Sequence, residues 1–203
     1  MLDTSQYQAT HIKYKVIDLE KFSPNISIPE ELKLEDNGKF KILHSFMFSE
    51  EREQKFKGNI KGSRYIVEAV DRLVKEGYPV EFLYYDRVPA SQFRFIQAQA
   101  SIVVEELIRG DWGSTAVESV ALGKPVITYV RKVWEEFYYR CFPETKPLPF
   151  IVADKNSIYE ALKKVITDEG FRLSTSKHSR SWAELHLDPR INVKKFAKIL
   201  EGY

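Results

Sequence analysis

The sequence predicts an α/β fold in which helices cover both faces of a doubly wound, Rossmann-like parallel sheet. Three observations predict it. Strand and helix patterns alternate from Lys39 onward, the connections between them are short, and the strands are continuous apolar runs. Such runs are typical of strands buried on both faces. Ligands of these folds bind at the carboxyl ends of the strands, so we expect function in the loops after residues 45, 85, 107 and 130.

The first 38 residues are predicted to be a separate N-terminal segment. Residues 10–17 alternate polar and apolar side chains, which is typical of a half-buried strand. The residues that follow contain two prolines, an Asn-Gly pair and many charges, so we expect an ordered connector there. The remaining chain, residues 39–203, is predicted to be the Rossmann-like domain with its terminal helices.

Within the domain, apolar runs predict the strands, and amphipathic or capped stretches predict the helices. The expected strands are 39–45, 79–85, 101–107, 125–130 and 149–153. The expected helices are 63–76, 91–98, 113–123 and 133–141, a helix that Asn156 caps, and about 170–186 and 190–201. Gly77 follows the first of these helices, where a glycine tolerates the positive φ of a helix C-terminus, and Gly123 closes the helix 113–123.

Composition narrows the function classes. The chain has 203 residues, of which 43% are hydrophobic and 30% charged, so it is globular rather than disordered. A formal net charge of +2 argues against a protein that coats a polyanion. The single cysteine, Cys141, excludes an intramolecular disulfide and a multi-cysteine metal site. The sequence contains neither a signal-peptide pattern nor an apolar membrane span, so we expect a cytoplasmic protein.

The most basic stretch is the loop after the first domain strand. It holds the cations Arg52, Lys55, Lys57, Lys61 and Arg64. A helix is expected directly after Gly62, where backbone N–H groups and the helix dipole favour an anion, so a phosphate or diphosphate is the expected ligand. The alternative is a solvated loop, because three nearby glutamates offset part of the charge.

A second candidate segment spans residues 109–127. Its loop Gly110-Asp111-Trp112-Gly113 leads into a helix at Ser114, so another helix N-terminus lies at the ligand edge of the sheet. Glu118 follows on the first turns of that helix among small and apolar neighbours. A carboxylate accepts two hydrogen bonds from a sugar diol such as a ribose. The alternative is a surface glutamate on an amphipathic helix.

Five segments carry a resemblance to a known family. They are IDLEKFSP, NIKGSRYIVEAVDRLVKEGY, ASIVVEEL, GSTAVESVALGKPVI and NSIYEALKKVITD. In this order they resemble the donor-binding half of the retaining group 1 glycosyltransferases, which have the GT-B fold. The match runs from about residue 10 to the end of the chain. The resemblance implies a Rossmann-like domain of the GT-B C-terminal type.

The resemblance also implies roles for particular residues. Lys61 matches the family's phosphate-binding lysine, with Lys57, and then Lys55, as the candidate for its partner arginine. Glu118 matches the second glutamate of the family's paired-glutamate motif, which holds the ribose. The first glutamate would lie at position 110, where this chain has Gly110. Asp111 or the backbone N–H groups of 111–114 are its expected replacements. The expected donor-binding residues are Lys57, Lys61, Asp111, Trp112, Gly113, Ser114, Thr115 and Glu118; no catalytic residue is identified.

The implied reaction of the complete enzyme is retaining hexosyl transfer from a nucleotide diphosphate sugar, without a metal or other cofactor. A GT-B enzyme has two Rossmann-like domains, and this chain has the length of one. The expected partners are therefore the nucleotide sugar and a missing N-terminal acceptor domain or partner chain, not nucleic acid, and the chain is expected to be inactive alone. Two alternatives stay open: a non-catalytic nucleotide-sugar binding module, and a fragment of a GT-B-fold nucleotide-sugar epimerase.

Overall fold

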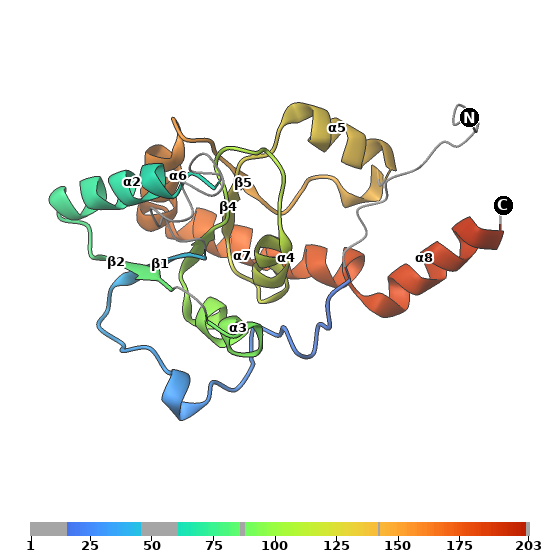
Figure 1. Cartoon of the computed structure of the whole chain (residues 1–203), viewed down its shortest axis with the longest axis horizontal. Coiled ribbons are helices and arrows are strands. Elements are labelled where there is room, and N and C mark those ends of the chain that lie inside the picture. Colours follow the sequence, from blue (N-terminus) through green and yellow to red (C-terminus); the bar gives the residue numbers. More distant parts are fainter. Residues whose placement is uncertain (1–15, 46–60, 86–87, 142, 202–203) are drawn as a thin grey trace, which may run out of the picture.

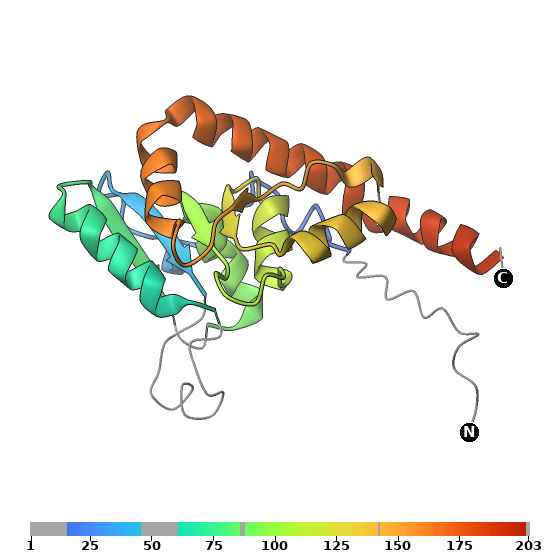
Figure 2. The same cartoon turned by 90° about the horizontal axis from the view of Figure 1, so that it is seen from above.

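A computed structural model of the chain describes residues 16–45, 61–85, 88–141 and 143–201 (Figures 1 and 2). Five parallel strands form one sheet in the order β2-β1-β3-β4-β5. The strands are β1 Phe40–His44, β2 Val80–Tyr84, β3 Ile102–Val104, β4 Val126–Thr128 and β5 Ile151–Val152. Each lies within one of the predicted strands, so the predicted parallel α/β sheet is confirmed.

The helices alternate with the strands as predicted. They are α2 Ser63–Lys75, α3 Ala90–Gln99, α4 Ser114–Ala121, α5 Lys132–Cys141, α6 Ile158–Thr167, α7 Glu169–His186 and α8 Pro189–Glu201. Two short 3-10 turns, η2 Glu30–Leu32 and η3 Pro143–Thr145, lie in the connections. Of the described residues, no helix is both long and apolar enough to cross a membrane.

The sheet is doubly wound, with helices packed against both of its faces. Successive strand residues therefore point into two separate hydrophobic cores. Ile42 belongs to a core that includes side chains of α2 and α6. The next residue, Leu43, belongs to the other core, which includes side chains of α3, α4 and α7. This alternation follows from the strand geometry, in which consecutive side chains point to opposite faces. The apolar runs of the sequence are thus buried on both faces.

The N-terminal connector packs onto the second of these cores. Ile17, Leu19, Phe22 and Leu34 are half-buried against it, and the Ile17 N–H donates to the Leu187 carbonyl at 2.9 Å. The expected strand at 10–17 falls almost entirely outside the described residues, and residues 16–29 contain turns rather than a strand.

One predicted helix cap is wrong. Asn156 does not cap α6; the Asp154 carboxylate instead accepts the N–H groups of Asn156 and Ser157 at 2.9 and 3.0 Å. The Asp154 carbonyl also accepts the Ile158 N–H at 3.0 Å, which begins the helix. Both side chains have the acceptor oxygen that a cap requires, and Asp154 stands two residues earlier, directly before the turn.

Candidate functional site

The strand order places a crevice between β1 and β3. From β1 the chain moves to β2 on one side and then crosses to β3 on the other side. In open α/β sheets, ligands bind where the order reverses in this way, outside the carboxyl ends of the strands. Ser45 follows β1 at this edge, and Glu105 and Glu106 follow β3.

The start of α2 lies against the loop that follows β3. Gly62 has a φ of +79°, and a Cβ built on it would lie 2.9 Å from the Cβ of Leu107. The Leu107 N–H donates to the Lys61 carbonyl at 3.0 Å. A larger residue at position 62 would force the two segments apart. The glycine therefore lets Lys61 lie close to the residues that follow β3.

A buried histidine joins the two central strands to α2. His44 has no exposed surface, and its Nδ1 lies 2.8 Å from the Val104 carbonyl. A carbonyl only accepts hydrogen bonds, so Nδ1 donates to it, and Nε2 lies 2.8 Å from the Ser63 hydroxyl. Ser63 is the first residue of α2. His44 thus holds the start of α2 at the end of β1.

Glu105 lies beneath the start of α4. Its side chain is 2% exposed, and its Oε1 accepts a hydrogen bond from the Lys61 ammonium at 2.9 Å. A Cβ built on Gly113, the residue directly before α4, would lie 2.7 Å from the same oxygen. The Thr128 hydroxyl lies 3.4 Å from the other carboxylate oxygen. The ion pair therefore joins the segment before α2 to the residues that follow β3.

Glu106 organises the loop before α4. Its carboxylate accepts four backbone N–H groups, those of Ile108, Arg109, Gly110 and Asp111, at 2.7 to 3.2 Å. Burial raises the pKa of the Glu106 carboxyl above its ordinary value, while these four hydrogen bonds oppose the rise. The loop is therefore wrapped around a carboxylate of the chain itself.

Gly110 stands at the position where the family that the sequence resembles has a glutamate. The backbone conformation at this position favours a glycine. Its φ is +73°, a conformation that L side chains rarely adopt. A Cβ there would also meet the side chain of Arg131 at 2.1 Å. The tight loop around Glu106 and a side chain at position 110 are therefore incompatible without rearrangement.

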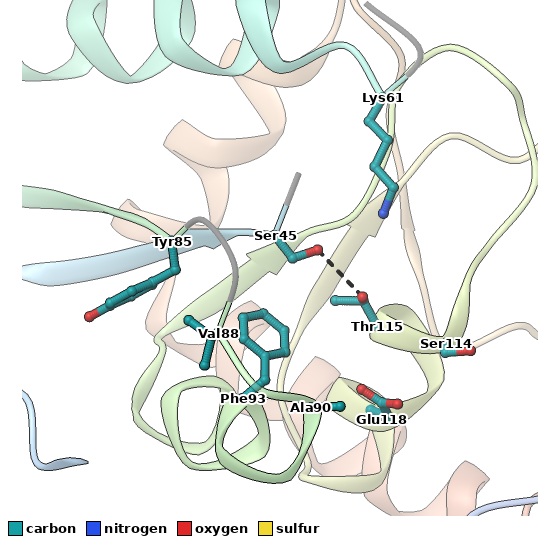
Figure 3. Close-up of a pocket in the computed structure, with 9 residues that line it drawn as sticks. All are labelled: Ser45, Lys61, Tyr85, Val88, Ala90, Phe93, Ser114, Thr115 and Glu118. Carbon is teal, nitrogen blue, oxygen red and sulfur yellow. Dashed lines mark hydrogen bonds between the residues drawn. The ribbon is translucent and has the colours of Figure 1, made fainter. Parts of the chain in front are cut away.

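A pocket of about 330 Å³, here called pocket A, opens at this edge of the sheet (Figure 3). Lys61 points into it from one side, and Val88 and Phe93 lie on another side (Figure 3). The Ser45 hydroxyl lies 3.4 Å from the Thr115 hydroxyl. Glu118, on the second turn of α4, also lines it. The full lining is Ser45, Lys61, Tyr85, Val88, Ala90, Phe93, Ser114, Thr115 and Glu118.

A second pocket of about 320 Å³, here called pocket B, adjoins pocket A at Lys61. It is lined by Lys61, Glu105, Glu106, Arg109, Asp111, Trp112, Gly113, Ser114 and Thr115. The two pockets share Lys61, Ser114 and Thr115. They therefore meet at the N-terminus of α4, where backbone N–H groups and the helix dipole favour an anion.

The predicted site residues are largely brought together. Seven of the eight line pocket A or pocket B, and the eighth, Lys57, lies with Lys55 outside the described residues. Trp112 is 7% exposed, and its indole packs against Tyr138 and Phe150 with ring centroids 5.2 and 5.4 Å away. Most of the Trp112 side chain is therefore packed in the hydrophobic core.

Sequence reasoning missed Glu105 and Glu106 as members of the site. They were included in the expected strand 101–107, whereas β3 ends at Val104. The available signal was a pair of carboxylates at the end of an apolar run, at the ligand edge of the sheet. Among the described residues, no group of three or more His, Cys, Asp or Glu side chains could hold a metal ion.

Comparison with known proteins finds similar folds among solved structures. No family model matches the sequence, and no curated protein matches it. Anabaena HepE, solved in complex with UDP and glucose, matches with a TM-score of 0.59 at 13% identity, over 93% of this chain and 56% of that chain. Sucrose-phosphate synthase from Thermosynechococcus elongatus matches with a TM-score of 0.58 at 16% identity, over 93% of this chain and 51% of that chain.

A third solved structure, WaaG, is a glycosyltransferase involved in lipopolysaccharide biosynthesis. It matches with a TM-score of 0.50 at 14% identity, over 84% of this chain and 50% of that chain. The chain thus spans about half the length of the solved structures that it matches. At these identities the likeness establishes the fold. The chain has a Rossmann-like α/β fold that matches part of GT-B glycosyltransferase structures.

Proposed function

We propose that this chain is the donor-binding domain of a glycosyltransferase and that it binds a nucleotide diphosphate sugar for retaining hexosyl transfer. One observation carries the proposal: pockets A and B meet at Lys61 and the start of α4, at the switch point of the sheet. A diphosphate is the link between the two halves of a nucleotide sugar. Two pockets joined by a cationic centre suit a ligand with that layout.

In this proposal the diphosphate lies where the two pockets join. The N–H groups at the start of α4 and the ammonium of Lys61 face it, and charge-assisted hydrogen bonds of this kind are the strong ones. During transfer the same groups stabilise the charge that develops on the departing diphosphate. This role requires no metal ion, and metal-independent binding remains a prediction.

Pocket A suits the nucleoside. In this proposal the Glu118 carboxylate accepts the two hydroxyls of the ribose, and Val88 and Phe93 provide an apolar wall for the base. Pocket B then receives the sugar, close to Asp111 and Arg109. The polar groups of pocket B are suited to a polyhydroxyl ligand.

The proposed enzyme needs an acceptor domain or partner chain, because the chain has about half the length of the structures it matches. Exposed apolar side chains in the segments near pocket B support this. Ile108, Val133 and Trp134 are 39%, 64% and 37% exposed. The Arg131 N–H donates to the Gly110 carbonyl at 3.1 Å, which joins the segment before α5 to the loop of pocket B.

A second candidate is a nucleotide-sugar binding module without catalysis. The observation that favours it is Gly110, since the family to which the sequence bears a resemblance has a glutamate at that position. A module that only binds donor has no need of that contact. Glucosyl transfer by the chain, measured alone and with a candidate acceptor domain, separates the two functions.

Calorimetry tests the proposal. UDP, ADP and GDP, and the glucose conjugate of each, are titrated into the purified chain with and without EDTA. We expect at least one of the three nucleotides to bind saturably, and its glucose conjugate to bind saturably as well. EDTA should leave both affinities unchanged. Failure of all of them to bind a folded chain would overturn the proposed function.

A further inference from the structure

Glu105 has a role at the phosphate site that the resemblance does not supply. We infer that Glu105 is a specificity-determining residue: its buried carboxylate is a built-in counter-ion of this site and favours a diphosphate esterified to a sugar over the free nucleoside diphosphate. The inference rests on the proposed function and extends it, because it states which form of the nucleotide the site prefers.

The geometry places the carboxylate at the groups that attract the ligand. Glu105 Oε1 lies 2.9 Å from the Lys61 ammonium, and it lies against Gly113, the residue directly before α4. Lys61 and the start of α4 are the two cationic features shared by pockets A and B. A diphosphate that binds to them therefore lies close to a negative charge of the chain itself.

The carboxylate is held in place. Glu105 is 2% exposed, and the close approach to Gly113 is open only because position 113 has no Cβ. The Thr128 hydroxyl, at 3.4 Å, lies beside its other oxygen. A carboxylate enclosed in this way cannot turn to solvent when an anion arrives. Its negative charge therefore repels an anion that binds where pockets A and B meet.

The two forms of the nucleotide differ in charge at the phosphate nearest the sugar pocket. The terminal phosphate of a free nucleoside diphosphate loses its second proton at about pH 6, like a phosphate monoester. In a nucleotide sugar that oxygen is esterified and carries no charge. The fixed charge of Glu105 therefore repels the free diphosphate more than the conjugate. The same preference assists release of the nucleotide once the sugar has been transferred.

The experiment compares ligands that differ in this one charge. The β-methyl ester of the nucleoside diphosphate lacks the terminal charge but adds no sugar, so it separates charge from sugar contacts. Calorimetry gives Kd of the free diphosphate and of its β-methyl ester for the full chain and for Glu105→Gln, which keeps the shape and removes the charge. We expect the ratio of the free diphosphate's Kd to the ester's Kd to fall about tenfold in the variant, the scale of a unit-charge interaction near a protein surface.

Glu118→Gln is the matched control, because it removes a carboxylate from the ribose side of the same site. We expect it to weaken both ligands together and to leave the ratio unchanged. An unchanged ratio in a folded Glu105→Gln variant would overturn the inference while leaving the proposed function intact. If the wild-type chain binds neither nucleotide nor ester, the proposed function fails and the inference fails with it.

A measurement on the wild-type chain keeps the inference testable if Glu105→Gln does not fold. The built-in counter-ion predicts that the β-methyl ester binds at least as tightly as the free diphosphate. Uncompensated cations predict the reverse, since they favour the ligand with more charge. A wild-type chain that binds the free diphosphate about tenfold more tightly than the ester contradicts the inference.

Discussion

His44 Nε2 lies 2.8 Å from Ser63 Oγ, in a position where neither residue meets solvent. This hydrogen bond joins the last residue of β1 to the first residue of α2. Lys61 lies only two residues before Ser63 in the sequence. The placement of Lys61 at the join of pockets A and B therefore depends on a buried polar contact as well as on the sheet.

His44→Leu tests this contact. The variant leaves the Ser63 hydroxyl and the Val104 carbonyl without the imidazole, and a buried polar group that loses its partner costs about 1–3 kcal/mol. We expect the free energy of unfolding, measured by urea denaturation, to fall by about that amount. The double variant His44→Leu/Ser63→Ala should recover part of the loss, because it removes both partners. Equal losses in the single and double variants would contradict the assignment.

Lys61→Ala tests the phosphate site. The lysine lines both pockets and holds the Glu105 carboxylate at 2.9 Å. Its removal takes away a charge-assisted hydrogen bond, so we expect nucleoside diphosphate binding to weaken by about 1–3 kcal/mol, measured by calorimetry. Lys177→Ala, which truncates an exposed lysine on α7, is the control and should not change the affinity. An unchanged affinity in a folded Lys61→Ala variant would show that the phosphate lies elsewhere.

Gly110→Ala tests why this chain has no glutamate at that position. A side chain at a φ of +73° costs about 1–2 kcal/mol in backbone strain, and the new Cβ also meets Arg131. We expect a loss of at least that size in the free energy of unfolding. In Gly110→Ala/Arg131→Ala the contacts with Cγ and Cδ of Arg131 are removed, whereas the contact with its Cβ at 3.0 Å and the backbone strain remain. A Gly110→Ala variant as stable as the wild type would mean that the loop tolerates a side chain.

Glu76 predicts a pH dependence of stability. A hydrogen bond from the Tyr159 hydroxyl, first, and then those from Arg72 and Lys163 hold the pKa of Glu76 below its ordinary value of 4.5. A lowered pKa in the folded state means that ionised Glu76 stabilises the fold above pH 4.5, and that this contribution is lost as the pH falls through the lowered pKa. The hydrogen bond between Tyr159 and Glu76 joins α6 to the end of α2.

Thermal unfolding of the wild type and Glu76→Gln across the acid range measures this contribution. We expect the two midpoints to differ most above pH 4.5 and to converge as Glu76 becomes protonated. Glu160→Gln removes an exposed carboxylate from α6 and is the control, with a smaller and less pH-dependent difference. A difference that grows as the pH falls would contradict the assigned direction.

The sheet was predictable from sequence because its strands are apolar on both faces. Ile42 and Leu43 feed opposite cores, and only a doubly covered strand accommodates such a run. Once the strands are parallel, their carboxyl ends share one edge, so Lys61 and Glu118 were expected to be neighbours although 57 positions separate them in the sequence. The structure places both in the lining of pocket A.

The polar interior of the site was not predictable in the same way. Glu105 and Glu106 continue an apolar run, and their partners are a lysine 44 positions away and four N–H groups of a tight loop. Nothing in the local pattern distinguishes such carboxylates from solvated ones. The glycine at position 110 likewise has its reason in a backbone conformation and in Arg131, which a sequence pattern does not reveal.

Glu118→Gln tests the ribose contact, on which the assignment of pocket A to the nucleoside depends. Glu118 lies on the second turn of α4 and lines pocket A together with Lys61. A ribose diol offers two donors, and a carboxylate accepts both. The amide keeps the shape but loses the charge and replaces one acceptor with a donor. We expect nucleoside diphosphate affinity, measured by calorimetry, to fall by about 1–3 kcal/mol. Inorganic pyrophosphate has no ribose, so its affinity should be nearly unchanged. Equal losses for both ligands would indicate a disturbed phosphate site, and no loss for either would remove Glu118 from the nucleotide site.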